Sequence, residues 1–152
     1  MPHKYASLLT SKGITNCPCT SHAAAGGLAY RFVELPAWSL SNYIPRGQMP
    51  GVPPRPPRPL NLSLSPQAAA KQNALQCSNW GGLSLFRTEA EARTFFIAKM
   101  QDNPHFTQTH IAELLLTHTD GWVTPHTNSG HFDLLESDTA VIFTAIQAQT
   151  VI

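Results

Sequence analysis

Proline dominates the middle of the chain. Residues 50–59 read PGVPPRPPRP, and proline both fixes φ and removes the backbone N–H donor. Such a segment can form neither a helix nor a central strand. We therefore predict that residues 50–59 are extended in polyproline II form, within a proline-rich connector or lid over residues 45–66. This run divides the chain into an N-terminal third and a C-terminal half.

Length and composition indicate one domain over residues 1–152. A chain of 152 residues with 42% hydrophobic residues can close one core and is short for two. Its formal net charge of +1 gives no support for nucleic-acid binding. No segment approaches the roughly 20 apolar residues of a membrane span. Three cysteines, an odd number, favour a reducing, cytoplasmic compartment.

The first half and centre of the chain contain strand and helix signals. Residues 28–35 alternate as a strand, with Tyr30 and Arg31 on opposite faces. The alanine-rich residues 67–75 predict a short helix, and a strand follows around Ser84. The strongest element is a helix over residues 89–101. Its capping box is formed by Thr88 and Glu91, and the turn signal Asn103-Pro104 follows it.

The C-terminal part predicts short strands. We expect residues 110–116 and 122–126 to form a hairpin around the turn at 119–121, residues 132–135 to add a short strand, and residues 139–146 to close the sheet. Together these elements predict an α+β domain with an antiparallel or mixed sheet.

Cysteine and histidine offer two candidate sites. Structural zinc uses thiolate and imidazole ligands, which Cys17, Cys19, His22 and Cys77 could supply, but the one-residue spacing of the first pair disfavours a tetrahedral site. We expect buried or idle thiols and no zinc. A histidine cluster leaves two alternatives open, a catalytic or metal role for at least one member or ordinary positions at turns. Its members are His105, His110, His118, His126 and His131.

A third set of residues spans the chain. Arg31 lies on an early strand, Ser84 on a middle strand that runs into a helix, and Glu136 precedes the last predicted strand. In order and setting they resemble the Arg, Ser and Glu of the ADP-ribosyltransferase superfamily. The resemblance covers the order of elements along the whole chain. The usual Ser-Thr-Ser triplet is absent, and Glu113 is a rival for the acidic position.

The resemblance implies a small NAD-using transferase domain of a toxin or defence type. It implies that Arg31, with its neighbour Tyr30, binds NAD and clamps the dinucleotide phosphates, because the guanidinium fork matches phosphate geometry. It implies that Ser84 holds the nicotinamide pocket and that Glu136 stabilises the oxocarbenium character of the ribose. All three side chains would then line one cleft.

A protein interaction module is the alternative. The connector contains the PxxP pattern Pro53-Pro54-Arg55-Pro56, and aromatic residues flank several predicted loops. Here Arg31 and Glu136 are surface charges, Ser84 fills space, and the partner is a protein instead of NAD.

Overall fold

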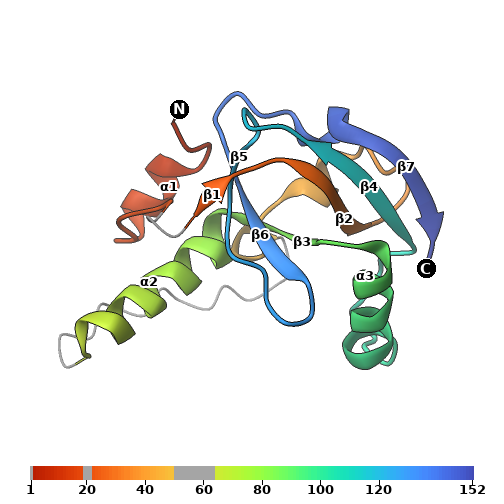
Figure 1. The fold of residues 1–152 in the computed structure, drawn as a ribbon, viewed down its shortest axis with the longest axis horizontal. Coiled ribbons are helices and arrows are strands. Elements are labelled where there is room, and N and C mark those ends of the chain that lie inside the picture. The colour runs from red at the N-terminus through yellow and green to blue at the C-terminus, as the bar shows by residue number, and fades with distance from the viewer. Residues whose placement is uncertain (1, 19–21, 50–63) are drawn as a thin grey trace.

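A single antiparallel sheet organises the molecule. The structure is a computed structural model, and it describes residues 2–18, 22–49 and 64–152. Within these residues the 7-stranded sheet has the order β1-β5-β6-β3-β2-β4-β7, and neighbouring strands are antiparallel (Figure 1). The predicted α+β class is therefore confirmed. The strands are β1 (Ala23–Ala24), β2 (Gly27–Val33), β3 (Gly82–Phe86), β4 (His110–Leu116), β5 (Gly121–Val123), β6 (His131–Glu136) and β7 (Ile146–Val151).

Side-chain caps mark the starts of two of the three α-helices in the described part of the chain, α2 and α3. They are α1 (Ala6–Ser11), α2 (Pro66–Gly81) and α3 (Glu89–Phe95), which a π-helical turn, Phe96–Met100, extends. The Thr88 hydroxyl accepts a hydrogen bond from the Glu91 amide at 3.1 Å, so the predicted capping box and the helix that follows it are confirmed. Of the predicted connector 45–66, residues 50–63 lie outside the described part of the chain.

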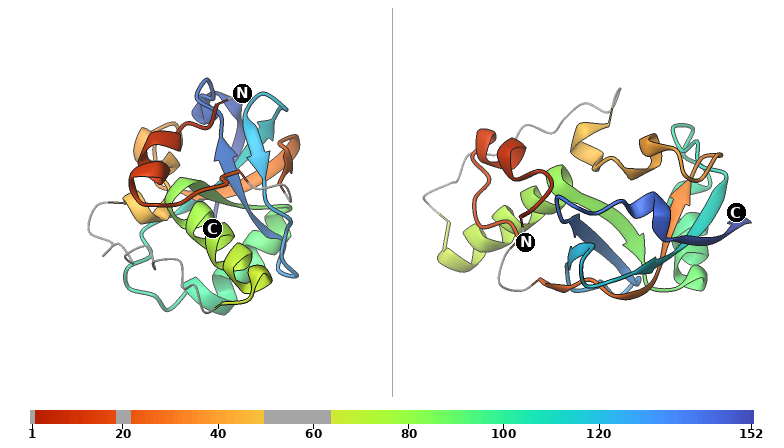
Figure 2. Two further views of the ribbon diagram at one scale, coloured as in Figure 1. Left: turned by 90° about the vertical axis from the view of Figure 1, so that its left-hand side faces the viewer. Right: turned by 90° about the horizontal axis from the view of Figure 1, so that it is seen from above.

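Helix α2 is longer than the predicted residues 67–75. Ser65 caps it and Pro66 occupies its first turn. Its C-terminal half buries Cys77 and Trp80 in a cluster with Leu9 of α1, and α1 lies against α2 (Figure 2). Tertiary burial thus extends the helix beyond the alanine-rich stretch.

The two faces of the sheet have different roles. On β6, Leu134 and Glu136 point to one face, which we call the Glu136 face, and Asp133 points to the other, which we call the Ser84 face because Ser84 pairs with Asp133. The Glu136 face buries the main core, whose members include Ala29, Leu83, Leu85, Leu114, Leu134, Tyr43 and Ile142. On the Ser84 face, α2 leads into β3 and β3 leads into α3, so the two helices leave opposite ends of one strand (Figure 1).

Two predicted strand arrangements are wrong. Strands β4 and β5 do not form a hairpin, because β4 pairs with β2 and β7 whereas β5 pairs with β1 and β6. Gly121 (φ +140°) has the backbone carbonyl of Leu135 so near that a Cβ would overlap it, which fixes β5 against β6. The closing strand is β7, residues 146–151 instead of 139–146, because residues 142–145 form a 3-10 turn.

The prediction of buried or idle thiols is right about the burial of Cys77 and wrong about free thiols at Cys17 and Cys77. Cys17 and Cys77 form a disulfide across 60 residues of sequence, and Cys77 is fully buried. The bond ties the N-terminal segment to α2. None of the helices in the described part of the chain has the length and apolar character needed to cross a bilayer.

Candidate functional site

Glu136 is a fully buried carboxylate at the end of β6. Lys4 Nζ donates to its Oε1 at 2.9 Å, and the Tyr5 hydroxyl donates to its Oε2 at 3.5 Å. Burial raises the pKa of Glu136, and the neighbouring Lys4 and Arg31 oppose that rise. Burial and the same carboxylate raise the pKa of Tyr5 to about 12. Glu136, the acid predicted from sequence, is therefore buried at a position where the cations of Lys4 and Arg31 favour its ionised form.

The N-terminal segment delivers these partners by pairing with the end of β6. The amide of Lys4 donates to the Glu136 carbonyl at 3.0 Å, the amide of Asp138 donates to the Pro2 carbonyl at 3.0 Å, and His3 bridges to Ser137. These backbone bonds hold Lys4 and Tyr5 beside the carboxylate. Sequence reasoning missed both residues, because the pairing joins positions more than 130 apart and leaves no local pattern.

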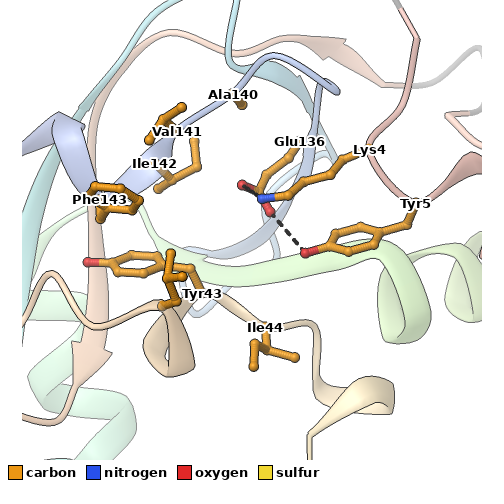
Figure 3. Close-up of a pocket in the computed structure, with 10 residues that line it drawn as sticks. Lys4, Tyr5, Tyr43, Ile44, Glu136, Ala140, Val141, Ile142 and Phe143 are labelled. Atoms are coloured by element: carbon orange, nitrogen blue, oxygen red, sulfur yellow. Dashed lines mark hydrogen bonds and ion pairs between the residues drawn. The ribbon is translucent and has the colours of Figure 1, made fainter.

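A cavity of about 340 Å³ opens beside Glu136, a volume at the small end of the range for ligand sites. Figure 3 shows Lys4 and Tyr5 on one side of the carboxylate and the Tyr43 and Phe143 rings on the other side of the space. The lining residues are Lys4, Tyr5, Leu40, Tyr43, Ile44, Glu136, Ala140, Val141, Ile142 and Phe143. The ion pair of Lys4 and Glu136 is surrounded by mostly apolar and aromatic side chains. Such a cavity can hold a flat ligand that carries a charge, because the rings contact its faces and the ion pair contacts its charge.

Arg31 extends from β2 on the same face as Glu136. Its Nε donates to the Asn42 carbonyl at 2.5 Å, and its Nη1 donates to the Ser84 carbonyl at 2.7 Å. The guanidinium lies 6.0 Å from the centre of the Tyr43 ring. Burial lowers the pKa of Arg31, and its interactions with Tyr43 and Glu136 oppose that effect. The two backbone bonds fix the guanidinium while leaving further N–H donors for an anion.

Ser84 meets Arg31 through its backbone and not through its hydroxyl. The Ser84 Oγ lies 2.7 Å from His131 Nε2 and 3.5 Å from Asp133 Oδ1, both on the Ser84 face. Tyr30 points to this face as well, and its hydroxyl donates to Glu113 at 3.0 Å. The structure therefore brings Arg31 and Glu136 to one face and places the side chains of Ser84, Tyr30 and Glu113 on the other.

The remaining candidates separate in space. His131 contacts Ser84, whereas His126 contacts Arg87 Nη1 at 3.0 Å. Cys17 and Cys77 are joined, and Cys19 lies outside the described residues. His22 interacts electrostatically with Asp133, and burial lowers its pKa. Among residues 2–18, 22–49 and 64–152, no group of His, Cys, Asp and Glu side chains is arranged to hold a metal ion.

No family model, curated protein or solved structure matches this chain.

Proposed function

We propose that this chain is a small NAD-using domain of the ADP-ribosyltransferase type, with its dinucleotide site on the Glu136 face. The observation that carries the proposal is the joint placement of Arg31 and Glu136 on one face of the sheet. Glu136 lines a cavity with aromatic walls, and the Arg31 guanidinium lies 6.0 Å from the centre of the ring of Tyr43, which also lines that cavity. The nicotinamide and its ribose would occupy the cavity. The phosphates would lie outside it, toward Arg31.

The residues support a cleavage step at the ribose. When the bond between ribose C1′ and the nicotinamide nitrogen breaks, its electron pair leaves with nicotinamide and positive charge develops on the ribose. A carboxylate at Glu136 would stabilise that charge. An acceptor nucleophile then bonds to C1′ and loses its proton. In the structure the Lys4 ammonium forms an ion pair with this carboxylate. In the complex with NAD, the cationic nicotinamide ring would replace the ammonium group as the partner of Glu136.

Arg31 would bind the dinucleotide phosphates. Two of its donors are fixed on the carbonyls of Asn42 and Ser84, so the orientation of the fork is set before a ligand arrives. In this proposal Ser84 contributes its carbonyl as an anchor for Arg31. Its hydroxyl has no part in the site.

The test is nicotinamide release from NAD by Glu136→Gln and a matched control, Glu113→Gln. We expect the Glu136 variant to lose at least about 100-fold in rate, the scale seen when one charge-stabilising group is removed. The Glu113 variant should keep the wild-type rate, because Glu113 lies on the Ser84 face. Equal loss in both variants, or wild-type release by the Glu136 variant, would refute the proposed role of Glu136.

A protein interaction module is the second candidate, and a specific observation favours it. Trp38 and Leu40 are 64% and 68% exposed, and Leu40 lines the rim of the cavity with the half-exposed Val141. An exposed apolar group of this kind is typical of protein contact surfaces. If Trp38→Ser abolishes capture of a cellular protein while NAD produces no binding heat, the interaction module is the better account.

The cytoplasmic location predicted above was inferred from thiols that stay reduced. Because Cys17 and Cys77 are joined, that argument no longer applies, and a structural disulfide is more typical of an oxidising compartment.

A further inference from the structure

A serine, a histidine and an aspartate meet on the Ser84 face, away from the proposed dinucleotide site. Ser84 pairs directly with Asp133 across β3 and β6, and His131 lies two residues away on the same face of β6. This diagonal relation lets the imidazole reach the hydroxyl, with Ser84 Oγ and His131 Nε2 2.7 Å apart. Ser84 is exposed, whereas the side chains of His131 and Asp133 are 27% and 17% exposed.

We propose that Ser84 is a nucleophilic serine, activated by His131, that accepts an acyl or phosphonyl group from an electrophilic substrate. A serine hydroxyl is a weak nucleophile until a base within hydrogen-bond reach can take its proton. The 2.7 Å contact meets that requirement. The Ser84 hydroxyl is farther from the Asp133 carboxylate, at 3.5 Å, so its nearer acceptor is the imidazole.

Asp133 is the acidic residue beside Ser84 and His131, and its position differs from that of the acid in a serine protease. Its Oδ1 lies 3.8 Å from His131 Nε2, the same nitrogen that faces Ser84. It therefore does not fix the tautomer through Nδ1, as the acid of a serine protease triad does. Instead, it stabilises the imidazolium once Nε2 has taken the serine proton. Burial raises the pKa of Asp133, and the adjacent His131 opposes this rise.

Neighbouring residues hold Ser84 and His131 in place, while the Ser84 hydroxyl stays exposed to solvent. The His131 ring packs edge-on against Phe86, which is 2% exposed, with ring centres 5.5 Å apart. Gly82, two residues before Ser84, leaves no room for a Cβ, because the Ser78 carbonyl would lie 2.7 Å from it. Strand β3 is thus held close to α2 and β6, while the hydroxyl of Ser84 faces solvent.

The chemical step balances with these residues. Ser84 Oγ attacks the carbonyl carbon of an activated ester, or the phosphorus of a fluorophosphonate, and its proton passes to His131 Nε2. The bond to the leaving group then breaks, and the leaving group keeps the electron pair of that bond. It departs as an alcohol, a thiol or fluoride. With an ester, His131 returns the proton to the leaving group, and a covalent acyl-serine remains.

A fluorophosphonate probe with mass spectrometric mapping tests the proposal without NAD. We expect wild-type protein to be labelled at Ser84, and the exposed Ser41 and Ser129 of the same molecules serve as internal controls. His131→Gln can still hydrogen-bond to Ser84 but cannot take a proton, so labelling should slow at least about 100-fold. His126→Gln, which removes a histidine that contacts Arg87, should label at the wild-type rate.

The pH dependence gives a second readout that a purely structural role would not produce. The labelling rate should rise with pH in the wild type, because only an unprotonated base can take the serine proton, and this rise should be absent in His131→Gln. Thermal melting confirms that each variant is folded. Absence of label at Ser84, equal label on the control serines, or an unchanged rate in His131→Gln would each overturn the proposal.

Discussion

At the scale of single residues, His3 is the clearest case of a group whose charge the fold excludes. It is 5% exposed and adjoins the backbone of Gly81, where an added Cβ would come within 2.9 Å of its ring. Its Nδ1 accepts a hydrogen bond from the Tyr5 amide at 3.0 Å. Burial, with a smaller effect of His22, lowers the pKa of His3 to about 4. The fold therefore requires a neutral imidazole.

The stability of the protein should fall in acid because of this residue. Between pH 6.5 and about 4 the unfolded chain binds a proton at His3 and the folded chain does not, so stability decreases as pH falls through this window. We expect a loss on the order of 2–3 kcal/mol, measured by urea unfolding at both ends of the window. His3→Gln should flatten this slope, whereas the exposed His118→Gln should leave it unchanged. Identical slopes in the wild type and His3→Gln would contradict the assignment.

At the scale of elements, local signals were enough to predict the unit from β3 to α3. The cap at Thr88 and the alternation of residues 82–86 are encoded within a few positions, so they are visible in sequence. The pairing of β5 with β6 depends on the positive φ of Gly121 and on its contact with another strand. The periodicity of apolar residues indicates neither of these features. The candidate site follows the same rule: alternation correctly separates Arg31 from Tyr30, but no local pattern reports that Lys4 reaches Glu136.

The disulfide is the element-scale feature with the largest expected effect on stability. Cys17 and Cys77 close a long loop, which typically contributes about 2–4 kcal/mol. Cys17→Ser should therefore lower the midpoint of urea unfolding under non-reducing conditions, and a reducing agent should lower the wild-type midpoint similarly. Cys17→Ser under reducing conditions serves as the control, and the reducing agent should leave its midpoint unchanged. Titration of three free thiols in the untreated, unfolded protein would contradict the bond.

At the scale of the whole molecule, one sheet carries two distinct sets of polar residues. Arg31 and Glu136 belong to the Glu136 face, with its core and cavity, and Ser84 and His131 belong to the face that α2 and α3 flank. Arg31, Ser84 and Glu136 follow one another in an order that resembles a known family, which predicted that all three side chains line one cleft. Alternation along β3 separates the Ser84 hydroxyl from that group, since it points away from its neighbours Leu83 and Leu85.

Calorimetric titration of NAD into the disulfide-bonded wild-type protein tests the central claim most directly. We predict a saturable binding heat with one site per chain, weakened at least about tenfold by Arg31→Ala, because a charge-assisted contact to phosphate is then lost. Thermal melting checks that the variant is folded. The absence of any saturable heat with the wild-type protein would contradict the claim that the Glu136 face is a dinucleotide site.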